Sequence, residues 1–114
     1  MDTPEKPSTI TIEEFAKIDF RIATIKAAEP HPKADRLFVL KIDMGAEERQ
    51  LVAGIRGHYT PEELVGKQIV VVANLQPAVL RGIESQGMLL AGSDSERVVI
   101  MTPEKPLAPG SKVK

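Results

Sequence analysis

The stretch "TPEELVGKQIVVVANL", residues 60–75, is the strongest indication of the fold class, because it places a short helix directly before a strand. Thr60 is a favourable N-cap residue, Pro61 fits the first helical position, and Gly66 is suited to end a helix, so we expect a helix over 61–65. The remaining "KQIVVVANL" is a nearly continuous β-branched run, which is typical of a strand covered on both faces. The stretch therefore predicts a helical turn that leads into a buried strand.

Extended segments flank this helix on both sides. Residues 19–28 predict a first strand, and a β-bulge within it is indicated because its apolar side chains change face partway along. A capping box at Thr11 predicts a second short helix that runs to about Lys17. Further strands are expected within residues 36–45, 49–55, 67–75, 87–93, 97–103 and 108–114. Three strands, a short helix and two more strands is the order of an OB-fold barrel.

The residues after Asp94 exceed what a five-stranded barrel needs. Their apolar side chains require cover, either from the barrel itself or from a second subunit, and we favour the second subunit. These side chains are Val98, Val99, Ile100, Met101 and Leu107. The predicted fold class is all-β, a five-stranded OB-fold barrel with short helices and a C-terminal strand extension. Residues 1–10 are expected to form a flexible N-terminal arm, and residues 11–114 the single domain.

Length and composition fit a small soluble domain. The chain has 114 residues, of which 42% are hydrophobic and 27% charged, so there is room for one core. The absence of cysteine excludes disulfides, thiolate metal sites and a cysteine nucleophile. No apolar run approaches the roughly 18 residues that a membrane span needs, and no signal segment is visible. We expect a cytoplasmic protein without membrane contact.

The sequence lacks the residue patterns of an enzyme. His31 and His58 stand on loops rich in turn residues, without carboxylates at metal-ligand spacing, and we interpret them as solvated loop residues. The glycines of "GIRGHY" are not followed by a long helix that could bind phosphate at its N-terminus. No candidate nucleophile stands beside a base. We therefore expect a non-catalytic protein without cofactor or metal ion.

The charge and aromatic content favour one kind of nucleic-acid binding over others. A formal net charge of −1 argues against a general nucleic-acid binder, which needs a basic excess. Only three phenylalanines and one tyrosine are present, and the phenylalanines stand on apolar faces, so bases of a single strand find no row of rings for stacking. The loops instead carry Arg, Lys, Ser, Asn and Gln, which suit recognition of a folded RNA through its shape, phosphates and 2′-hydroxyls.

Three motifs in a fixed order carry a resemblance to a known family: "YTPEELVGK" at residues 59–67, "VANL" at 72–75 and "RGIESQGM" at 81–88. With them, about residues 11–113 resemble the tRNA-binding domain of bacterial methionyl-tRNA synthetase C-termini. The same domain occurs as a free-standing homodimeric tRNA-binding protein and in eukaryotic synthetase-associated cofactors. The resemblance implies an OB-fold that dimerises through its C-terminal extension and neighbouring strands. It also implies non-catalytic, structure-specific binding to the outside corner of tRNA, with methionyl-tRNA synthetase as a further partner.

The resemblance also implies which residues contact RNA. Carried over by position, they are Lys33, Arg36, Asn74, Arg81, Ser85, Gln86 and Met88. The family pattern usually has basic residues where Gln76, Ala78 and Val79 stand here, so fewer phosphate contacts are expected.

Alternatives remain for single residues and for the function. Met88 could be a core residue at the start of a strand, Ser85 could satisfy a turn, and Asn74 could bond its own backbone. A sister group with the same fold resembles a peptide-binding export chaperone, in which a dimer cleft lined by apolar strands would hold an extended polypeptide. A module that only dimerises a synthetase is the third alternative.

Overall fold

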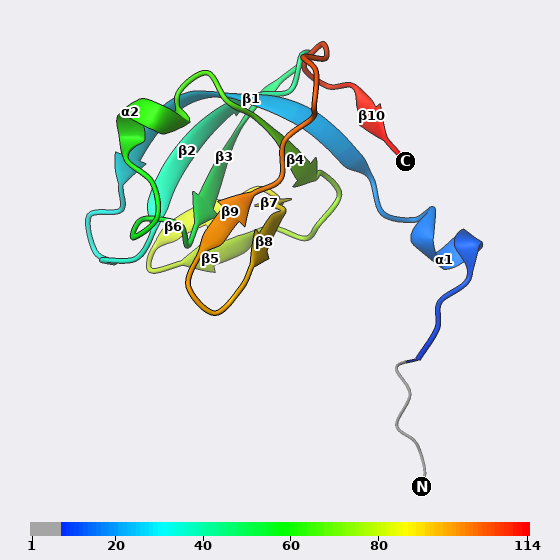
Figure 1. Ribbon diagram of the computed structural model, residues 1–114, viewed down its shortest axis with the longest axis horizontal. Helices are drawn as coiled ribbons and strands as arrows, with labels where there is room; N and C mark the ends of the chain where they lie inside the picture. Colours follow the sequence, from blue (N-terminus) through cyan, green and yellow to red (C-terminus); the bar gives the residue numbers. More distant parts are fainter. Residues whose placement is uncertain (1–7) are drawn as a thin grey trace, which may run out of the picture.

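The computed structural model describes residues 8–114, and it shows a strongly curved sheet with short helices and hairpins around it (Figure 1). The expected N-terminal arm falls mostly on residues 1–7, which lie outside the described residues; residues 8–10 are exposed and in no helix or strand. The elements in chain order are α1 (Ile12–Phe15), β1 (Phe20–Pro30), β2 (Phe38–Asp43), β3 (Glu48–Ala53), α2 (Pro61–Leu64), β4 (Gln68–Val72), β5 (Ala78–Leu80), β6 (Ile83–Ser85), β7 (Met88–Leu89), β8 (Ala91–Ser93), β9 (Val98–Ile100) and β10 (Lys112–Val113).

The main sheet is antiparallel and has the order β3-β2-β1-β4-β7, with β10 paired to the start of β1. The first half of β1 pairs with β4 and its second half with β2, and the register shifts between Ile25 and Ala27. The predicted β-bulge is thus confirmed. A bulge bends its strand and increases the local twist, so β1 can serve both halves of a closed sheet.

Hydrogen bonds between β3 and the segment after β6 close the sheet into a barrel. The backbone N–H of Gln50 donates to Oε1 of Gln86 at 3.0 Å, and the N–H of Gln86 donates to the Gln50 carbonyl at 2.8 Å. We call this junction of β3 with residues 85–87 the seam. At the seam, Gln86 accepts through its side-chain oxygen, where a paired strand would use a backbone carbonyl. The fold is all-β and OB-like, as the order of elements predicted.

The core fills the barrel. The largest fully buried side chains include Phe38, Leu40 and Ile69, and Leu64 of α2 is buried against them as the cover of one end. Both capping boxes form, with Thr11 and Thr60 as the N-caps, although each helix is shorter than expected.

The barrel covers part of the C-terminal extension by itself. Ile100 is buried in the core and Val98 packs against it, so the expectation that a second subunit covers them is wrong for these two side chains. Alternation along β9 explains this result, because successive side chains of a strand point to opposite faces. Val99, Met101 and Leu107 remain exposed.

Two local features differ from the sequence prediction. The expected fifth strand over 87–93 is divided into β7, which pairs with β4, and β8, which pairs with β9. The segment between β4 and β7 contains an additional hairpin, β5–β6. Its two-residue turn is Arg81–Gly82, with φ values of 54° and 90°. Positive φ at both turn positions matches the twist of a tight hairpin, and glycine is favoured there.

The C-terminal turn packs closely on the turn between β2 and β3. A Cβ atom at Gly45 would lie 2.5 Å from the Pro109 carbonyl oxygen, and one at Gly110 would overlap the Met44 carbonyl oxygen. The Gly110 N–H also donates to the Ile22 carbonyl at 2.7 Å. Side chains are therefore excluded where the two turns meet. Within residues 8–114, no helix is long and apolar enough to cross a membrane.

Candidate nucleic-acid interface

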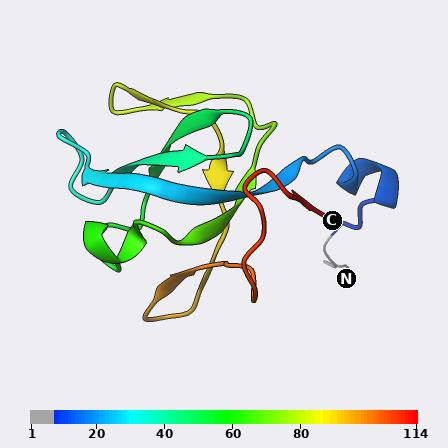
Figure 2. The ribbon, with the colours of Figure 1, turned by 90° about the horizontal axis from the view of Figure 1, so that it is seen from above.

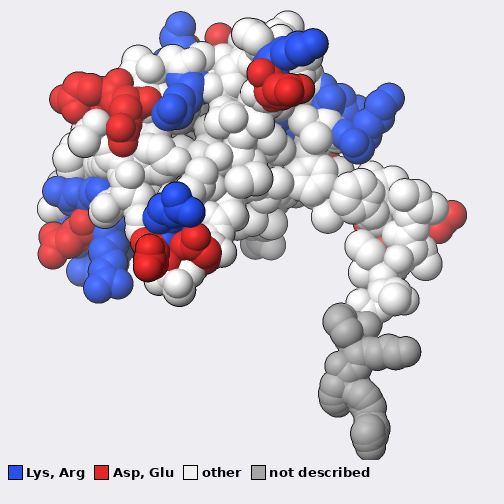
Figure 3. All heavy atoms as spheres, in the orientation of Figure 1, with Lys and Arg blue, Asp and Glu red and all other residues white. Residues whose placement is uncertain are grey.

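Four cationic side chains lie at one end of the barrel, which we call the basic end: Lys33, Arg36, Arg56 and Arg81. Lys33 and Arg36 stand on the loop of residues 31–37 between β1 and β2, Arg56 follows β3, and Arg81 is at the tip of the β5–β6 hairpin. Figure 3 shows Lys and Arg side chains gathered at the lower left, where Figure 1 places this loop and the hairpin turn. Three segments that are distant in sequence thus contribute to one surface.

The ring of His31 joins two of these segments. The Lys33 N–H donates to Nδ1 of His31 at 3.0 Å, and Nε2 of the same ring lies 3.0 Å from the Leu80 carbonyl oxygen. The side chain is buried, with 2% exposure. The interpretation of His31 as a solvated loop residue is therefore wrong. The hairpin that carries Leu80 was not predicted, so this contact could not be expected from the sequence.

Arg56 connects the third segment to the same loop. Its guanidinium Nη1 donates to the Ala34 carbonyl at 3.2 Å, and its backbone N–H donates to the Arg36 carbonyl at 3.4 Å. Arg56 is half-buried, whereas Lys33, Arg36 and Arg81 are exposed. Sequence reasoning missed Arg56 as a member of the site, because nothing in "GIRGHY" indicates which loop its side chain reaches.

The charge of the basic end is positive but not large. The described ion pairs of residues 8–114 involve Arg21, Arg49, Arg97 and Lys112, and none of them includes a cation of the basic end. Asp35 stands in the same loop and Glu84 on the same hairpin, so four cations face two nearby carboxylates. Unpaired cations at an exposed surface can bind phosphate oxygens without first breaking an ion pair.

Ser85 and Gln86 belong to the seam of the barrel. The Ser85 hydroxyl accepts from the Val52 N–H at 2.9 Å and donates to the Gly87 carbonyl at 2.9 Å. Its exposure is 5%. The side-chain oxygen of Gln86 accepts from Gln50 as described above, so the Ser85 hydroxyl and the Gln86 amide oxygen are both engaged within the chain. Their hydrogen bonds hold the base of the hairpin whose tip carries Arg81.

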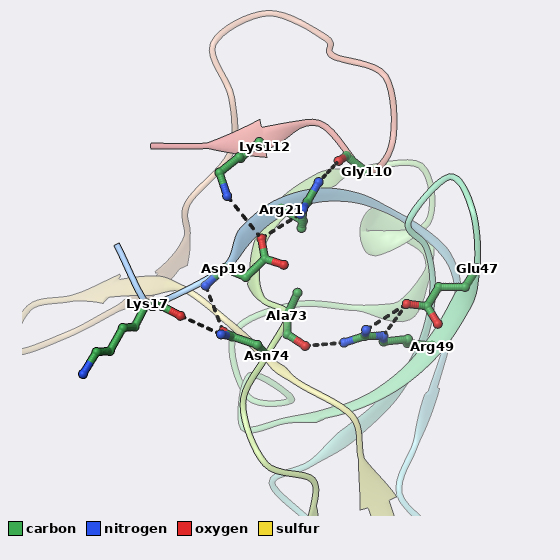
Figure 4. Close-up of polar contacts among 9 residues, drawn as sticks. All are labelled: Lys17, Asp19, Arg21, Glu47, Arg49, Ala73, Asn74, Gly110 and Lys112. Atoms are coloured by element: carbon green, nitrogen blue, oxygen red, sulfur yellow. Dashed lines mark hydrogen bonds and ion pairs between the residues drawn. The ribbon is translucent and has the colours of Figure 1, made fainter. Parts of the chain in front are cut away.

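Asn74 lies at the end of β4, in a polar network that Figure 4 shows. Its Oδ1 accepts from the Asp19 N–H at 2.8 Å, and its Nδ2 donates to the Lys17 carbonyl at 2.6 Å. Asp19 pairs in turn with Arg21 at 2.7 Å. The Asn74 amide is thus bound to the chain's own backbone, and it holds the segment that connects α1 to β1.

Met88 is exposed, at 49%, and stands between two apolar grooves. The hairpin groove, of about 310 Å³, lies between the hairpin and the barrel, and its walls include Leu75, Leu80, Ser85 and Met88. The helix-side groove, of about 480 Å³, lies near the α1–β1 connection, and its walls include Leu75, Met88, Asn74, Phe20 and Leu90. Met88 is not a core residue, contrary to the alternative given above.

The structure therefore divides the predicted set. Lys33, Arg36 and Arg81 meet at the basic end. Ser85 and Gln86 lie in the seam directly behind the hairpin, Met88 faces the grooves, and Asn74 lies beyond them. Within the described chain no three His, Cys, Asp or Glu side chains converge as metal ligands would.

Comparison with known proteins shows what the chain is similar to. Residues 20–112 match a family model described as "Putative tRNA binding domain". The chain is 49% identical over 110 residues to a methionine–tRNA ligase of Thermococcus kodakarensis, covering 96% of this chain and 15% of that protein. It is 55% identical over 109 residues to a methionine–tRNA ligase of Methanococcus aeolicus, covering 96% and 16%. The chain thus spans about 15% of the length of these curated relatives.

Solved structures of similar fold cover nearly the whole chain. A MetRS related protein from Pyrococcus horikoshii superposes with a TM-score of 0.89 at 33% identity, over 95% of this chain and 100% of that one. The chaperone CsaA from Bacillus anthracis superposes with a TM-score of 0.85 at 34% identity, over 94% and 100%.

Proposed function

Since this chain belongs to the tRNA-binding domain family, we propose that it binds folded tRNA through its basic end, as a homodimer and by recognising RNA structure. The family domain is a binding domain and not a catalytic one. A tRNA partner would place the protein in the cytoplasm. The observation that supports this assignment most directly is the convergence of four unpaired cations from three segments on one end of the barrel.

We assign different roles to the predicted contact residues. Lys33, Arg36 and Arg81 would contact phosphates and 2′-hydroxyls, with Arg56 beside them. Asn74, Ser85 and Gln86 would act by holding the backbone, because the Asn74 amide, the Ser85 hydroxyl and the Gln86 amide oxygen already have partners in the chain. Met88 would offer an apolar contact at the border of the two grooves. Backbone phosphate contacts position an RNA without reading its sequence, which fits recognition by shape.

The proposed dimer interface lies on the opposite side of the molecule. Helix α1 has no buried residue, and Ile12 is 72% exposed, so packing against its own barrel removes little apolar surface of the helix from water. The apolar helix-side groove lies next to it. A second copy that covers both would remove exposed apolar surface from water. Two basic ends on one dimer would also raise the effective concentration of the second contact, which compensates for the small charge of each.

Binding of a tRNA transcript, of an RNA duplex and of an unstructured RNA, measured by filter binding at several salt concentrations, tests the proposal. We expect tRNA to bind most tightly. Arg81→Ala should weaken tRNA binding and reduce the slope of log K against log salt by about one, since one phosphate contact is lost. Arg97→Ala is the matched control, because Arg97 is exposed and pairs with Asp94 on another hairpin. Equal binding of all three RNAs would contradict the proposal.

One observation favours a second candidate function, a peptide-binding chaperone. The hairpin groove is lined mainly by apolar side chains, and its volume of about 310 Å³ suits one or two side chains of an extended peptide. The similarity to structures described as chaperones points in the same direction. Suppression of aggregation of a denatured client, measured beside tRNA affinity, separates the two functions. Activity toward the client in a protein that does not bind tRNA would favour the chaperone.

The relatives suggest a larger context. Because the chain matches only about 15% of the length of the methionine–tRNA ligases, we propose methionyl-tRNA synthetase as a partner, joined either covalently or as a separate subunit. In either arrangement the domain would add tRNA contacts to those of the synthetase.

A further inference from the structure

We propose that His31 is a positioning residue for RNA binding: its neutral ring, protonated on Nε2, clamps the 31–37 loop to the β5–β6 hairpin and thereby presents Lys33, Arg36 and Arg81 as one surface. This inference rests on the proposed function, because it explains how that surface is built. His31 itself is too deeply buried to contact RNA, with 2% exposure.

The hydrogen-bond partners of the ring define its protonation state. A backbone N–H can only donate, so Nδ1 of His31 must accept from Lys33 and carries no proton. A backbone carbonyl can only accept, so Nε2 must carry the proton that it donates to Leu80. Both contacts are made at 3.0 Å by one neutral tautomer. The opposite tautomer would lose both hydrogen bonds, and the charged form would lose the one to Lys33.

The clamp adds a direct link between two segments that are otherwise joined indirectly: Arg56, after β3, bonds to the 31–37 loop, and Gln50 and Val52 of β3 bond to the base of the hairpin. The 31–37 loop has no strand partner, and its own bonds, His31 N–H to the Leu37 carbonyl and Leu37 N–H to the Ala34 carbonyl, only close it on itself. Strand β5 is exposed at every residue, including Leu80 at 37%. Within the described chain, the His31 ring makes the side-chain hydrogen bond between this loop and the hairpin tip.

The neighbouring residue assists the geometry. Pro32 fixes its own φ and restricts His31 to extended conformations, which limits the directions that the ring can take. The backbone at His31 therefore loses less conformational freedom on folding than it would without the proline. Without the clamp, Lys33 and Arg36 would no longer keep a fixed separation from Arg81, and an RNA would have to order them upon binding.

A double-mutant cycle tests whether His31 acts through the basic end. We expect His31→Ala to weaken tRNA binding by about threefold to tenfold, and Lys33→Ala to cost less in the His31→Ala background than in the unaltered protein, because coupled residues are not additive. His31→Gln and His31→Asn each retain one polar partner and should recover part of the affinity. His58→Ala is the matched control, since His58 is exposed in a neighbouring loop. Thermal unfolding of each variant confirms that the domain is folded.

The tautomer supplies a readout that does not depend on RNA. Imidazole nitrogen shifts from NMR should show a proton on Nε2 of His31 and none on Nδ1. A proton on Nδ1, or shifts that average over the two tautomers, would overturn the clamp. Additive effects of His31→Ala and Lys33→Ala in a protein that does bind tRNA would overturn this inference alone. Failure of the unaltered protein to bind tRNA would overturn the proposed function and, with it, the role of the clamp in RNA binding.

Discussion

Ser85 shows how one hydroxyl can determine the position of a hairpin. Its Oγ atom accepts from Val52 on β3 and donates to Gly87, so a single side chain bonds to both sides of the barrel seam. The resemblance implies that Ser85 contacts RNA, whereas these hydrogen bonds indicate that it stabilises the fold. A buried hydroxyl with both bonds made contributes to stability chiefly because removing it leaves a buried partner unsatisfied.

Replacing this hydroxyl distinguishes a role in stability from a direct contact with RNA. Ser85→Ala should lower the free energy of unfolding by about 1–3 kcal/mol, because the Val52 N–H would lose its partner in a buried position. The affinity of the folded protein for tRNA should fall less than in Arg81→Ala, because Ser85 acts only by holding the hairpin. Urea denaturation and filter binding measure the two effects, and Ser95→Ala, at an exposed position, is the control. Unchanged stability together with lost tRNA binding would show instead that Ser85 contacts RNA directly.

Among the elements, the C-terminal turn depends most directly on small residues. Gly110, at φ 89°, faces the Met44 carbonyl, and the bonds around it bring β10 onto the start of β1. The last part of the extension, around β10, is therefore held by close backbone approach, whereas Val98 and Ile100 anchor its first part in the core.

Gly110→Ala should consequently detach β10. The new Cβ would overlap the Met44 carbonyl oxygen at a backbone conformation that alanine adopts with strain, and we expect a loss of about 2 kcal/mol or more in the free energy of unfolding. Hydrogen exchange should accelerate at the Ile22 N–H, which donates to Ser111. Gly57→Ala is the matched control, because no atom lies within 4 Å of a Cβ at Gly57. Equal effects of the two changes would contradict this account of the turn.

The helices and strands also show how much of the fold could be predicted from the sequence. Strong local signals predicted the helices and the long strands: the capping box at Thr11, the N-cap Thr60 followed by Pro61, and the apolar run before Asn74. The change of face predicted the bulge in β1. Hairpin β5–β6 escaped prediction because β5 is exposed along its length and has no apolar alternation. The seam and the His31 clamp depend on which carbonyl meets which side chain across the barrel, and periodicity carries no information on such contacts.

In the whole molecule, α1 projects from the barrel at the end away from the 31–37 loop (Figures 1 and 2). The ring centroids of Phe15 and Phe20 lie 5.7 Å apart, which gives an apolar contact between α1 and β1. Asn74 fixes the connection between them. The projecting helix is therefore oriented, although it is scarcely buried.

If α1 forms the dimer interface, Ile12→Lys should produce monomers without destabilising the barrel, because Ile12 is 72% exposed and supports no core residue. The affinity for tRNA should fall by about tenfold or more through loss of bivalent binding. Light scattering and filter binding at the same protein concentrations measure both effects. Val65→Lys, at 50% exposure beside α2, is the control. A dimer that survives Ile12→Lys would place the interface elsewhere.

The placement of α1 and β10 on the same side has a practical consequence. A fluorescent protein, an affinity tag or a surface anchor joined near β10 would project from the end of the barrel away from the turn of the β5–β6 hairpin (Figures 1 and 2). An attachment at this position leaves the basic end uncovered. If the basic end binds tRNA as proposed, the domain can therefore be immobilised or fused to another polypeptide without losing that binding.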